Sequence, residues 1–315
     1  MTALAVIRSF FRQEGLKASL QQMKAWLLAA RPKTLPAAIV PVWVGSMPLL
    51  VDGNPETGSW MLFWFTLVSC ICIQIATNLF NDAIDHKKGA DTEKRLGPRR
   101  VTASGLLSQK AVMGGALFFC LLAAGISIPL ILERGWPIVA IGLVSLFFAY
   151  GYTGGPFPLA YRGMGELFVI LFFGFVAVLG SFFVQSGLVG DIQIWTLGLQ
   201  CGLYSSVLIA INNLRDIEED RGTGKMTLAV RFGKTFARWE IAVFCLLPIL
   251  LGVGLSLAGY FHLGNGLLFL LLLIIGVPIV LGVSRTEPSE KYNKFLAMGA
   301  LQLLGFAALV SFLFS

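Results

Sequence analysis

Long apolar runs recur along the whole sequence and constrain its fold more than any other feature. Each run is close to the length of about 20 residues that a helix needs to cross the hydrocarbon core of a bilayer. A helix satisfies its own backbone hydrogen bonds, which an apolar solvent cannot do for it. Charged residues make up 13% of the chain, against about 25% in soluble domains. The sequence therefore predicts an all-α polytopic membrane protein and excludes a soluble globule, a coiled coil and a secreted disulfide scaffold.

Breaks rich in charge, glycine or proline divide the apolar runs into nine expected transmembrane helices. The fourth run is short for a span, about 15 residues, but the alternation of charge between the loops requires it. The expected spans are residues 35–51, 59–81, 111–132, 137–151, 166–185, 193–213, 238–258, 265–284 and 295–314.

The basic residues decide the expected orientation. If the N-terminus is cytoplasmic, all of the 24 Lys and Arg residues except Arg134 fall in cytoplasmic segments, as the positive-inside rule requires. The net charge of +7 then marks the cytoplasmic face of a lipid bilayer, not a nucleic-acid partner. Residues 1–30 mix basic and apolar side chains, and we expect a basic amphipathic segment on the cytoplasmic leaflet. A transmembrane domain is expected over residues 31–315.

Two polar stretches follow the second and sixth expected spans, both on the cytoplasmic side. If those helices continue past their apolar parts, the polar residues of each stretch share one face. The first stripe is Gln74, Asn78, Asn81, Asp82 and Asp85, with Asp91 further on, and the second is Ser205, Asn212, Asp216 and Asp220.

These carboxylates predict a cation between them, because acids at a membrane interface are costly and repel one another. Carboxylate oxygens suit Mg²⁺, which completes its shell with water and phosphate oxygens. Lys225, Arg215, Arg221 and the run around Arg99 are placed to grip the outer phosphate oxygens. The alternative is that both stretches are solvated loops with surface ion pairs. The sequence favours a cytoplasm-facing site for a Mg²⁺-bound diphosphate.

The ordered set of motifs is similar to the UbiA superfamily of intramembrane prenyltransferases, within it to the branch that prenylates 1,4-dihydroxy-2-naphthoate in menaquinone synthesis. The first motif of the general family has an acid where this chain has Gly89. The next carboxylate here is Asp91, a spacing that resembles the naphthoate branch. The motifs are Ala30-Arg-Pro-Lys-Thr-Leu-Pro, Asn81-Asp-x-x-Asp-x-x-x-Gly-x-Asp-Thr, Tyr152-Thr-Gly-Gly-Pro-Phe-Pro, Gly165-Glu-Leu-Phe and Asn212-Asn-x-Arg-Asp-x-x-x-Asp-x-x-x-Gly-Lys.

The resemblance implies Mg²⁺-dependent transfer of a polyprenyl group from polyprenyl diphosphate to 1,4-dihydroxy-2-naphthoate, with decarboxylation to demethylmenaquinol. It also implies a bacterial inner-membrane enzyme without an obligatory protein partner. The implied metal and diphosphate ligands are Asn81, Asp85, Asp91, Asp216 and Asp220, with Asp82 as their neighbour in the first motif. Asp85, Asp216 and Lys225 are the expected catalytic residues. The expected substrate-binding residues are Asn78, Asn81, Arg31, Lys33, Asn212, Asn213, Arg215, Tyr152 and Arg162.

Some roles stay open at the level of sequence. Arg31, Lys33 and Arg162 are candidates for holding the acceptor's carboxylate, although Arg31 and Lys33 fit equally as positive-inside anchors. Phe148, Tyr150 and Tyr152 are candidates for stabilising an allylic cation by position only.

Two other functions compete with this interpretation. One is a related enzyme acting on 4-hydroxybenzoate or homogentisate. The other is a transporter with an acidic cytoplasmic mouth, which predicts charges at the bilayer midplane or broken helices paired across repeats. The acids of this chain lie at one face instead.

Overall fold

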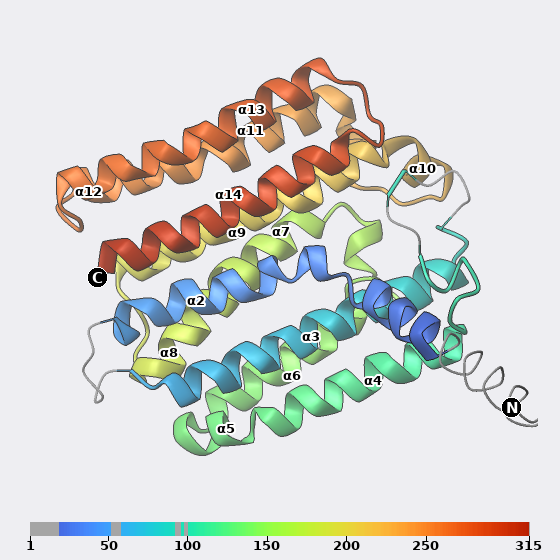
Figure 1. Cartoon of the computed structure of the whole chain (residues 1–315), viewed down its shortest axis with the longest axis horizontal. Coiled ribbons are helices and arrows are strands. Elements are labelled where there is room, and N and C mark those ends of the chain that lie inside the picture. Colours follow the sequence, from blue (N-terminus) through green and yellow to red (C-terminus); the bar gives the residue numbers. More distant parts are fainter. Residues whose placement is uncertain (1–18, 52–57, 92–95, 98–99, 315) are drawn as a thin grey trace, which may run out of the picture.

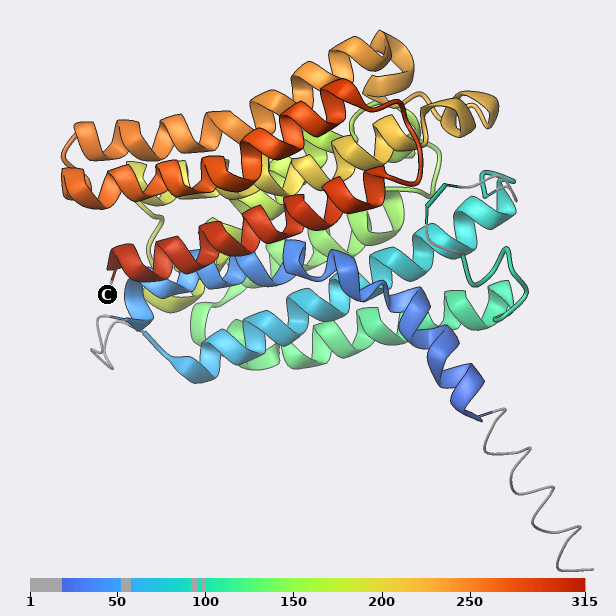
Figure 2. The ribbon, with the colours of Figure 1, turned by 45° about the horizontal axis from the view of Figure 1, so that its top comes forward.

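The computed structural model describes residues 19–51, 58–91, 96–97 and 100–314. All regular secondary structure in these ranges is helical, which confirms the all-α expectation. The helices run roughly along one axis and form a single elongated bundle (Figures 1 and 2).

After the helical residues 19–30, the elements follow in chain order. The first half contains η1 (Pro32–Thr34), α2 (Pro36–Leu50), α3 (Trp60–Lys87), α4 (Gln109–Ile126), α5 (Ile128–Arg134) and α6 (Trp136–Gly151). The middle contains η2 (Leu159–Tyr161), α7 (Gly165–Val169), the π-helix η3 (Ile170–Leu179), α8 (Gly180–Ser186) and α9 (Ile192–Arg215). The last part contains α10 (Ile217–Gly222), α11 (Leu228–Leu257), α12 (Leu263–Leu267), η4 (Leu268–Leu272), α13 (Leu273–Arg285) and α14 (Tyr292–Phe314).

Seven helices within the described ranges are long and apolar enough to cross a membrane, so the chain is an integral membrane protein. An eighth span results if residues 19–34 and α2, which meet at an angle of 50°, count as one. Helix α6 has 16 residues and matches the short fourth run expected from the sequence. The count of nine spans and the orientation stay predictions.

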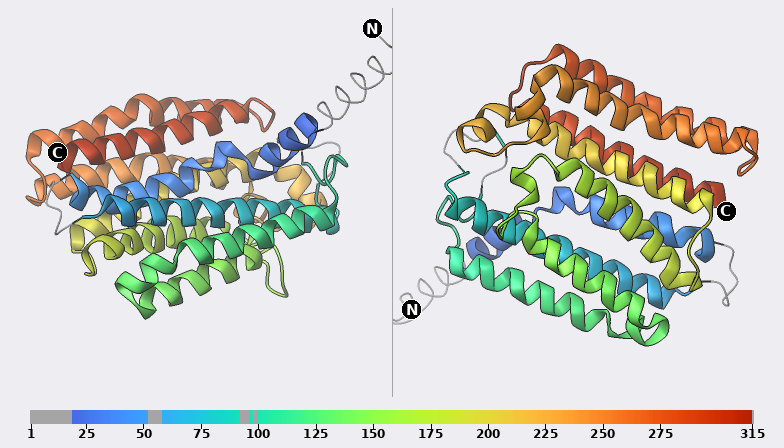
Figure 3. Two further views of the ribbon diagram at one scale, coloured as in Figure 1. Left: turned by 60° about the horizontal axis from the view of Figure 1, so that its bottom comes forward. Right: turned by 180° about the vertical axis from the view of Figure 1, so that it is seen from behind.

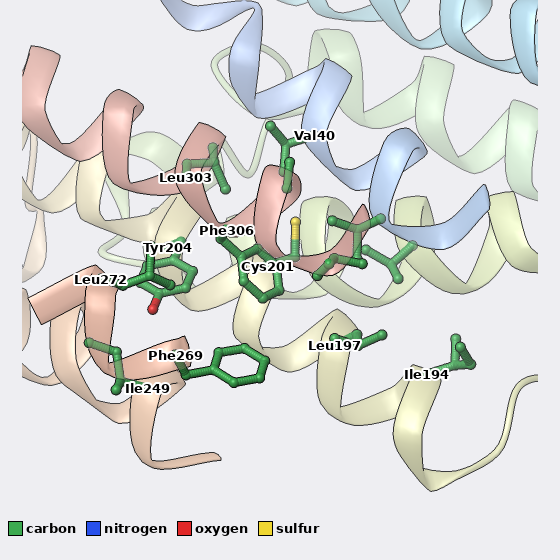
Figure 4. Close-up of a cluster of buried hydrophobic side chains, with 14 of the residues drawn as sticks. Val40, Ile194, Leu197, Cys201, Tyr204, Ile249, Phe269, Leu272, Leu303 and Phe306 are labelled. Atoms are coloured by element: carbon green, nitrogen blue, oxygen red, sulfur yellow. The ribbon is translucent and has the colours of Figure 1, made fainter. Parts of the chain in front are cut away.

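Helix α9 is the centre of the bundle. In the apolar 18-residue stretch of α9, 78% of the residues are buried, against 17% in the corresponding stretch of the α4–α5 span at the edge. It packs against α2, η3, α11 and α14. Tyr204 and Cys201 of α9 meet Phe306, Phe269 and Val40 in the largest buried apolar cluster (Figure 4). Figure 3 shows α4 and α6 at one edge of the bundle, and α11 and α13 at the other.

The two polar stretches lie at the same end of the bundle. The α3–α4 connection and α10 are found together there, whereas α5, α8, α12 and the C-terminus lie at the opposite end (Figure 1). Helix α3 continues past the apolar part of the second span to Lys87. Helix α9 instead ends at Arg215, so Asp216 and Asp220 do not share one continuous helix with Ser205 and Asn212, as the second stripe required.

The N-terminal segment is described only from residue 19, so residues 1–18 of the expected amphipathic stretch lie outside the described part. Residues 19–30 are helical, with Leu20, Met23 and Leu27 exposed. This helix ends at Arg31, whose φ of 52° is left-handed, and the chain then bends into α2. The membrane-surface role of residues 1–30 stays a prediction.

Candidate functional site

Gly89 ends helix α3 and turns the chain back toward the site. Its φ of 69° is left-handed, a conformation that glycine adopts without steric cost. The amide of Gly89 donates to the carbonyl of His86 at 3.0 Å, and the amide of Ala90 donates to that of Asp85 at 2.9 Å. These are the paired bonds of a Schellman cap. The second carboxylate of the first motif therefore comes after the turn, at Asp91.

Arg100 brings the carboxylates of the first motif together. Its Nη2 donates to Asp85 Oδ2 at 3.4 Å and its Nε donates to Asp91 Oδ1 at 3.2 Å. All three side chains are buried, with at most 9% exposed. A guanidinium between two buried carboxylates offsets their repulsion. Arg99, expected to grip phosphate from the same run, lies outside the described residues.

Asp82 belongs to a different contact. Its carboxylate accepts hydrogen bonds from the backbone amides of Val101, at 3.3 Å, and Thr102, at 2.9 Å. The residue is 1% exposed, and charge-assisted bonds of this kind are strong. They hold the segment after Arg100 against α3. Anchoring this segment is the contact that the structure shows for Asp82, and its expected role as a metal ligand stays a prediction.

The second motif lies where α9 ends and α10 begins. Nε and Nη2 of Arg215 donate to the two oxygens of Asp216, both at 2.7 Å, a bidentate geometry that fixes both groups. Lys225 Nζ lies 3.5 Å from Asp220 Oδ1. The two carboxylates of the second motif are thus each paired with a basic residue expected at the site.

Tyr161 connects the two motifs. Its hydroxyl donates to Asp85 Oδ1 at 2.9 Å, and its carbonyl accepts from the amide of Met226, beside the second motif, at 3.2 Å. Burial raises the pKa of Tyr161, as do the charge and hydrogen bond of Asp85 and the charges of Asp91 and Asp220. The phenol is therefore a protonated donor at neutral pH.

Lys88 supports the same corner of the site. Its Nζ donates to the carbonyl of Thr153 at 2.7 Å and lies 4.0 Å from the centre of the Tyr161 ring. The Thr153 hydroxyl donates to Asn81. Burial lowers the pKa of Lys88, while the charge of Asp85 opposes that change. Sequence reasoning did not identify Lys88, Thr153 or Tyr161 as site residues. Lys88 lies within the first carboxylate motif, Thr153 lies within the Tyr152-to-Pro158 motif, and Tyr161 follows that motif.

The donor set of the two motifs fits Mg²⁺ by its chemistry, since carboxylate and amide oxygens are hard ligands. Among the described residues, no three His, Cys, Asp or Glu side chains form a cluster that would hold a metal ion by themselves. Mg²⁺ usually takes only one or two protein carboxylates and completes its shell with water and phosphate oxygens. The arrangement suits a metal that arrives with a diphosphate. The oxygen donors are Asn81, Asp85, Asp91, Asp216 and Asp220.

A largely apolar cavity of about 300 Å³ begins at the amide side chains of both motifs. Asn78, Asn81 and Asn212 line one end, and Thr66 lines the wall farther along α3. At 1.5 Å per residue, Asn81 and Thr66 are about 22 Å apart along the helix. The wall includes Ile73, Ile141, Leu208 and, from η3, Phe172, Phe173, Val176 and Ala177.

Four of the five aromatic residues that line this cavity form one cluster, and its member Tyr152 adjoins Thr153, which binds Asn81. The rings of Phe168 and Phe172 stack with centroids 4.2 Å apart, and Phe148 and Tyr152 pack against them. Tyr152 and Phe148 were expected from the sequence. Tyr150 is 44% exposed and lies outside this cluster.

Helix α3 is tied to the bend before α2 by one of the expected binding residues. Asn78 Nδ2 donates to the carbonyl of Ala30 at 2.9 Å and to Thr34 Oγ1 at 3.0 Å. This bond brings the bend at Arg31 to the polar end of the cavity. Arg31 is half-buried there, whereas Lys33 is exposed.

The remaining expected residues make contacts of their own. Asn212 lines the cavity, but Asn213 donates to Glu166 Oε1 at 2.7 Å. Arg162 is exposed, and its guanidinium lies 3.8 Å from the centre of the Phe157 ring. The structure therefore brings Asn212 to the cavity and places the other two side chains elsewhere.

A polar site that opens into an apolar cavity, inside a bundle of membrane helices, defines an intramembrane enzyme for an amphiphilic anionic substrate. The profile of the UbiA prenyltransferase family matches residues 38–310. The chain belongs to this family and is a prenyltransferase, which excludes the transporter alternative.

Known relatives agree with this family. The chain is 31% identical over 296 residues to a 1,4-dihydroxy-2-naphthoate octaprenyltransferase of Haemophilus influenzae, covering 90% of this chain and 94% of that protein. It is 34% identical over 268 residues to the Escherichia coli protein of the same name, covering 80% and 82%. A solved UbiA homolog from Archaeoglobus fulgidus bound to GPP and Mg²⁺ is similar in fold, with a TM-score of 0.63, 13% identity and coverage of 91% and 99%.

Proposed function

We propose that this protein transfers a polyprenyl group from a polyprenyl diphosphate to 1,4-dihydroxy-2-naphthoate and releases the ring carboxylate, giving demethylmenaquinol. The observation that carries this proposal is that the two carboxylate motifs, joined by Tyr161, each place an asparagine, Asn81 and Asn212, at the lining of an apolar cavity. A prenyl diphosphate likewise has a charged diphosphate at one end and an apolar chain at the other. The named relatives from Haemophilus influenzae and Escherichia coli support the naphthoate as acceptor.

The polar end of the site binds and neutralises the diphosphate. When bound, Mg²⁺ supplies Lewis acidity toward the leaving group. Lys225 and Arg215 lie beside the carboxylates of the second motif, where their charges stabilise the departing diphosphate oxygens. The residues that would hold the metal are Asn81, Asp85, Asp91, Asp216 and Asp220.

The apolar end holds the prenyl chain and keeps water away from the allylic cation. The C–O bond to the diphosphate breaks near the aromatic rings that line the cavity. Stacking of such rings around a cation contributes about 0.5–2 kcal/mol per ring, and exclusion of water protects the cation from hydrolysis. Phe168, Phe172, Phe148 and Tyr152 are the rings in place for this role.

The naphthoate ring then attacks the allylic carbon, a C–C bond forms, and the carboxylate leaves as carbon dioxide. A basic residue at the polar end of the cavity must hold that carboxylate beforehand. Arg31 is favoured for this role, because Asn78 binds the adjacent bend and Arg31 is half-buried. Lys33 is exposed, and Arg162 stacks on Phe157.

We further propose nine spans in a bacterial inner membrane with the N-terminus in the cytoplasm. The Lys and Arg distribution supports this orientation. The site then faces the cytoplasm.

A competition between acceptors tests the naphthoate assignment. Purified protein is given Mg²⁺, one polyprenyl diphosphate and equal amounts of 1,4-dihydroxy-2-naphthoate and 4-hydroxybenzoate, and the products are identified by mass spectrometry. We expect the decarboxylated prenyl naphthalenediol alone. Product from 4-hydroxybenzoate alone would assign the protein to a different acceptor within the same family.

A further inference from the structure

The connection between α13 and α14 is held firmly against α11. Glu287 accepts hydrogen bonds from Lys234 Nζ and Arg238 Nη2, both at 2.9 Å, and these two bases lower the pKa of Glu287. At the start of α14, the hydroxyl of Tyr292 donates to the carbonyl of Thr286 at 2.9 Å. These contacts fix the position from which α14 begins.

Asn293 reaches from this fixed position to the diphosphate site. Its Oδ1 accepts from Arg215 Nη1 at 2.7 Å, and its Nδ2 donates to the carbonyl of Leu96 at 3.4 Å. The two partners are 78 and 197 residues away in sequence. One amide thus contacts the arginine of the second motif and the backbone of the connection that carries the first motif.

Arg215, which donates to Asn293, also binds the carboxylate of Asp216. Its Nε and Nη2 hold both oxygens of Asp216, and the side chain is 2% exposed. Because the guanidinium is planar, a partner at Nη1 also sets the direction of the other two bonds. Because Arg215 is buried whereas Asn293 is exposed, removing the Asn293 amide leaves Nη1 to bind water or another acceptor, and a turn of the guanidinium would move Asp216.

We propose that Asn293 is a positioning residue of the diphosphate site, which orients Arg215 and through it Asp216. Asn293 contacts Arg215 and Leu96, and the proposed effect on the site passes through Arg215. The inference rests on the proposed function, because it assigns the second motif to Mg²⁺ and diphosphate.

The test uses binding of inorganic pyrophosphate with Mg²⁺ to the purified full-length protein, measured by isothermal titration calorimetry. Asn293→Ala is expected to bind about tenfold more weakly, the effect of losing one hydrogen bond to a charged group. Asn293→Asp keeps an oxygen acceptor for Arg215 Nη1 and is expected to stay within about twofold of the wild type. The matched control is Asn265→Ala, which removes a half-buried amide from α12 at the opposite end of the bundle (Figure 1).

Each result supports or overturns the proposal. Wild-type affinity in Asn293→Ala overturns it, even if the melting temperature falls. Equal weakness of Asn293→Asp and Asn293→Ala overturns the route through Arg215. A wild-type protein that does not bind pyrophosphate with Mg²⁺ overturns the diphosphate site itself, a failure distinguishable from the loss of the Asn293 role alone.

Discussion

Tyr161 is the side chain that joins the two carboxylate motifs. Tyr161→Phe removes the hydroxyl bonded to Asp85 and keeps the ring beside Lys88. We expect kcat/KM for the polyprenyl diphosphate to fall about tenfold, as for other single hydrogen bonds to a charged group. Because the pKa of Tyr161 is raised, its hydroxyl stays protonated from about pH 6 to pH 9. The pH profile of the variant should therefore keep the wild-type shape, and a displaced limb would contradict this role.

Replacing Asp82 should lower the stability of the protein instead of its catalytic rate. Asp82→Ala removes the acceptor for two buried backbone amides, which costs about 1–3 kcal/mol for each amide left without a partner. We expect a lower melting temperature in detergent and an unchanged Mg²⁺ concentration for half-maximal activity. The exposed Glu133→Ala is the matched control. A normal melting temperature together with a higher Mg²⁺ concentration for half-maximal activity would support Asp82 as a metal ligand.

Helical spacing was sufficient for some residues of the site but not for others. Asn78, Asn81 and Asp85 were predictable because α3 stays helical to its last turn, so a period of 3.6 places them along one stripe. Arg100 comes from an irregular segment, and Tyr161 ends the three-residue helix η2. Their positions depend on tertiary contacts that no periodicity encodes.

The π-helix η3 forms one wall of the cavity. Ala177 of this wall is a small residue about midway along the cavity lining, so Ala177→Phe fills part of the space for the prenyl chain. We expect Ala177→Phe to shorten the longest prenyl chain that the enzyme accepts. Activity with a short-chain prenyl diphosphate should change little. Activity against a series of chain lengths measures this. Ala124→Phe, at an exposed position on α4, is the control, and an equal response of both variants would contradict the assignment of the wall.

The elements themselves were predictable to different degrees. Apolar run length was enough to predict α3, α9, α11 and α14, because each contains an uninterrupted apolar run of about 20 residues. The same signal does not distinguish η3 from an α-helix, since a uniformly apolar run carries no period. The bend at Arg31 was also not expected, because a left-handed residue there depends on the contacts of Asn78 and Thr34.

The number of spans decides on which side of the membrane each later loop lies. If the N-terminus is cytoplasmic and α6 does not cross the membrane, every loop after α6 lies on the side opposite to the one that nine spans predict. The five cysteines are free and are replaced by serine, after which single cysteines are introduced by Leu188→Cys and Glu290→Cys. With nine spans and a cytoplasmic N-terminus, a membrane-impermeant maleimide should label position 188 from the outer face and position 290 only after permeabilisation. The reverse pattern would contradict the arrangement of nine spans with a cytoplasmic N-terminus.

The most direct measurement is product formation by the purified protein from 1,4-dihydroxy-2-naphthoate and a polyprenyl diphosphate, followed by mass spectrometry. The wild type should form the decarboxylated prenyl product with Mg²⁺ and none with excess EDTA. Asp85→Asn and Asp216→Asn should lose at least about 100-fold in rate while remaining folded and inserted in the membrane. Full activity in either variant, or in EDTA, would contradict a Mg²⁺-diphosphate site built from the two motifs.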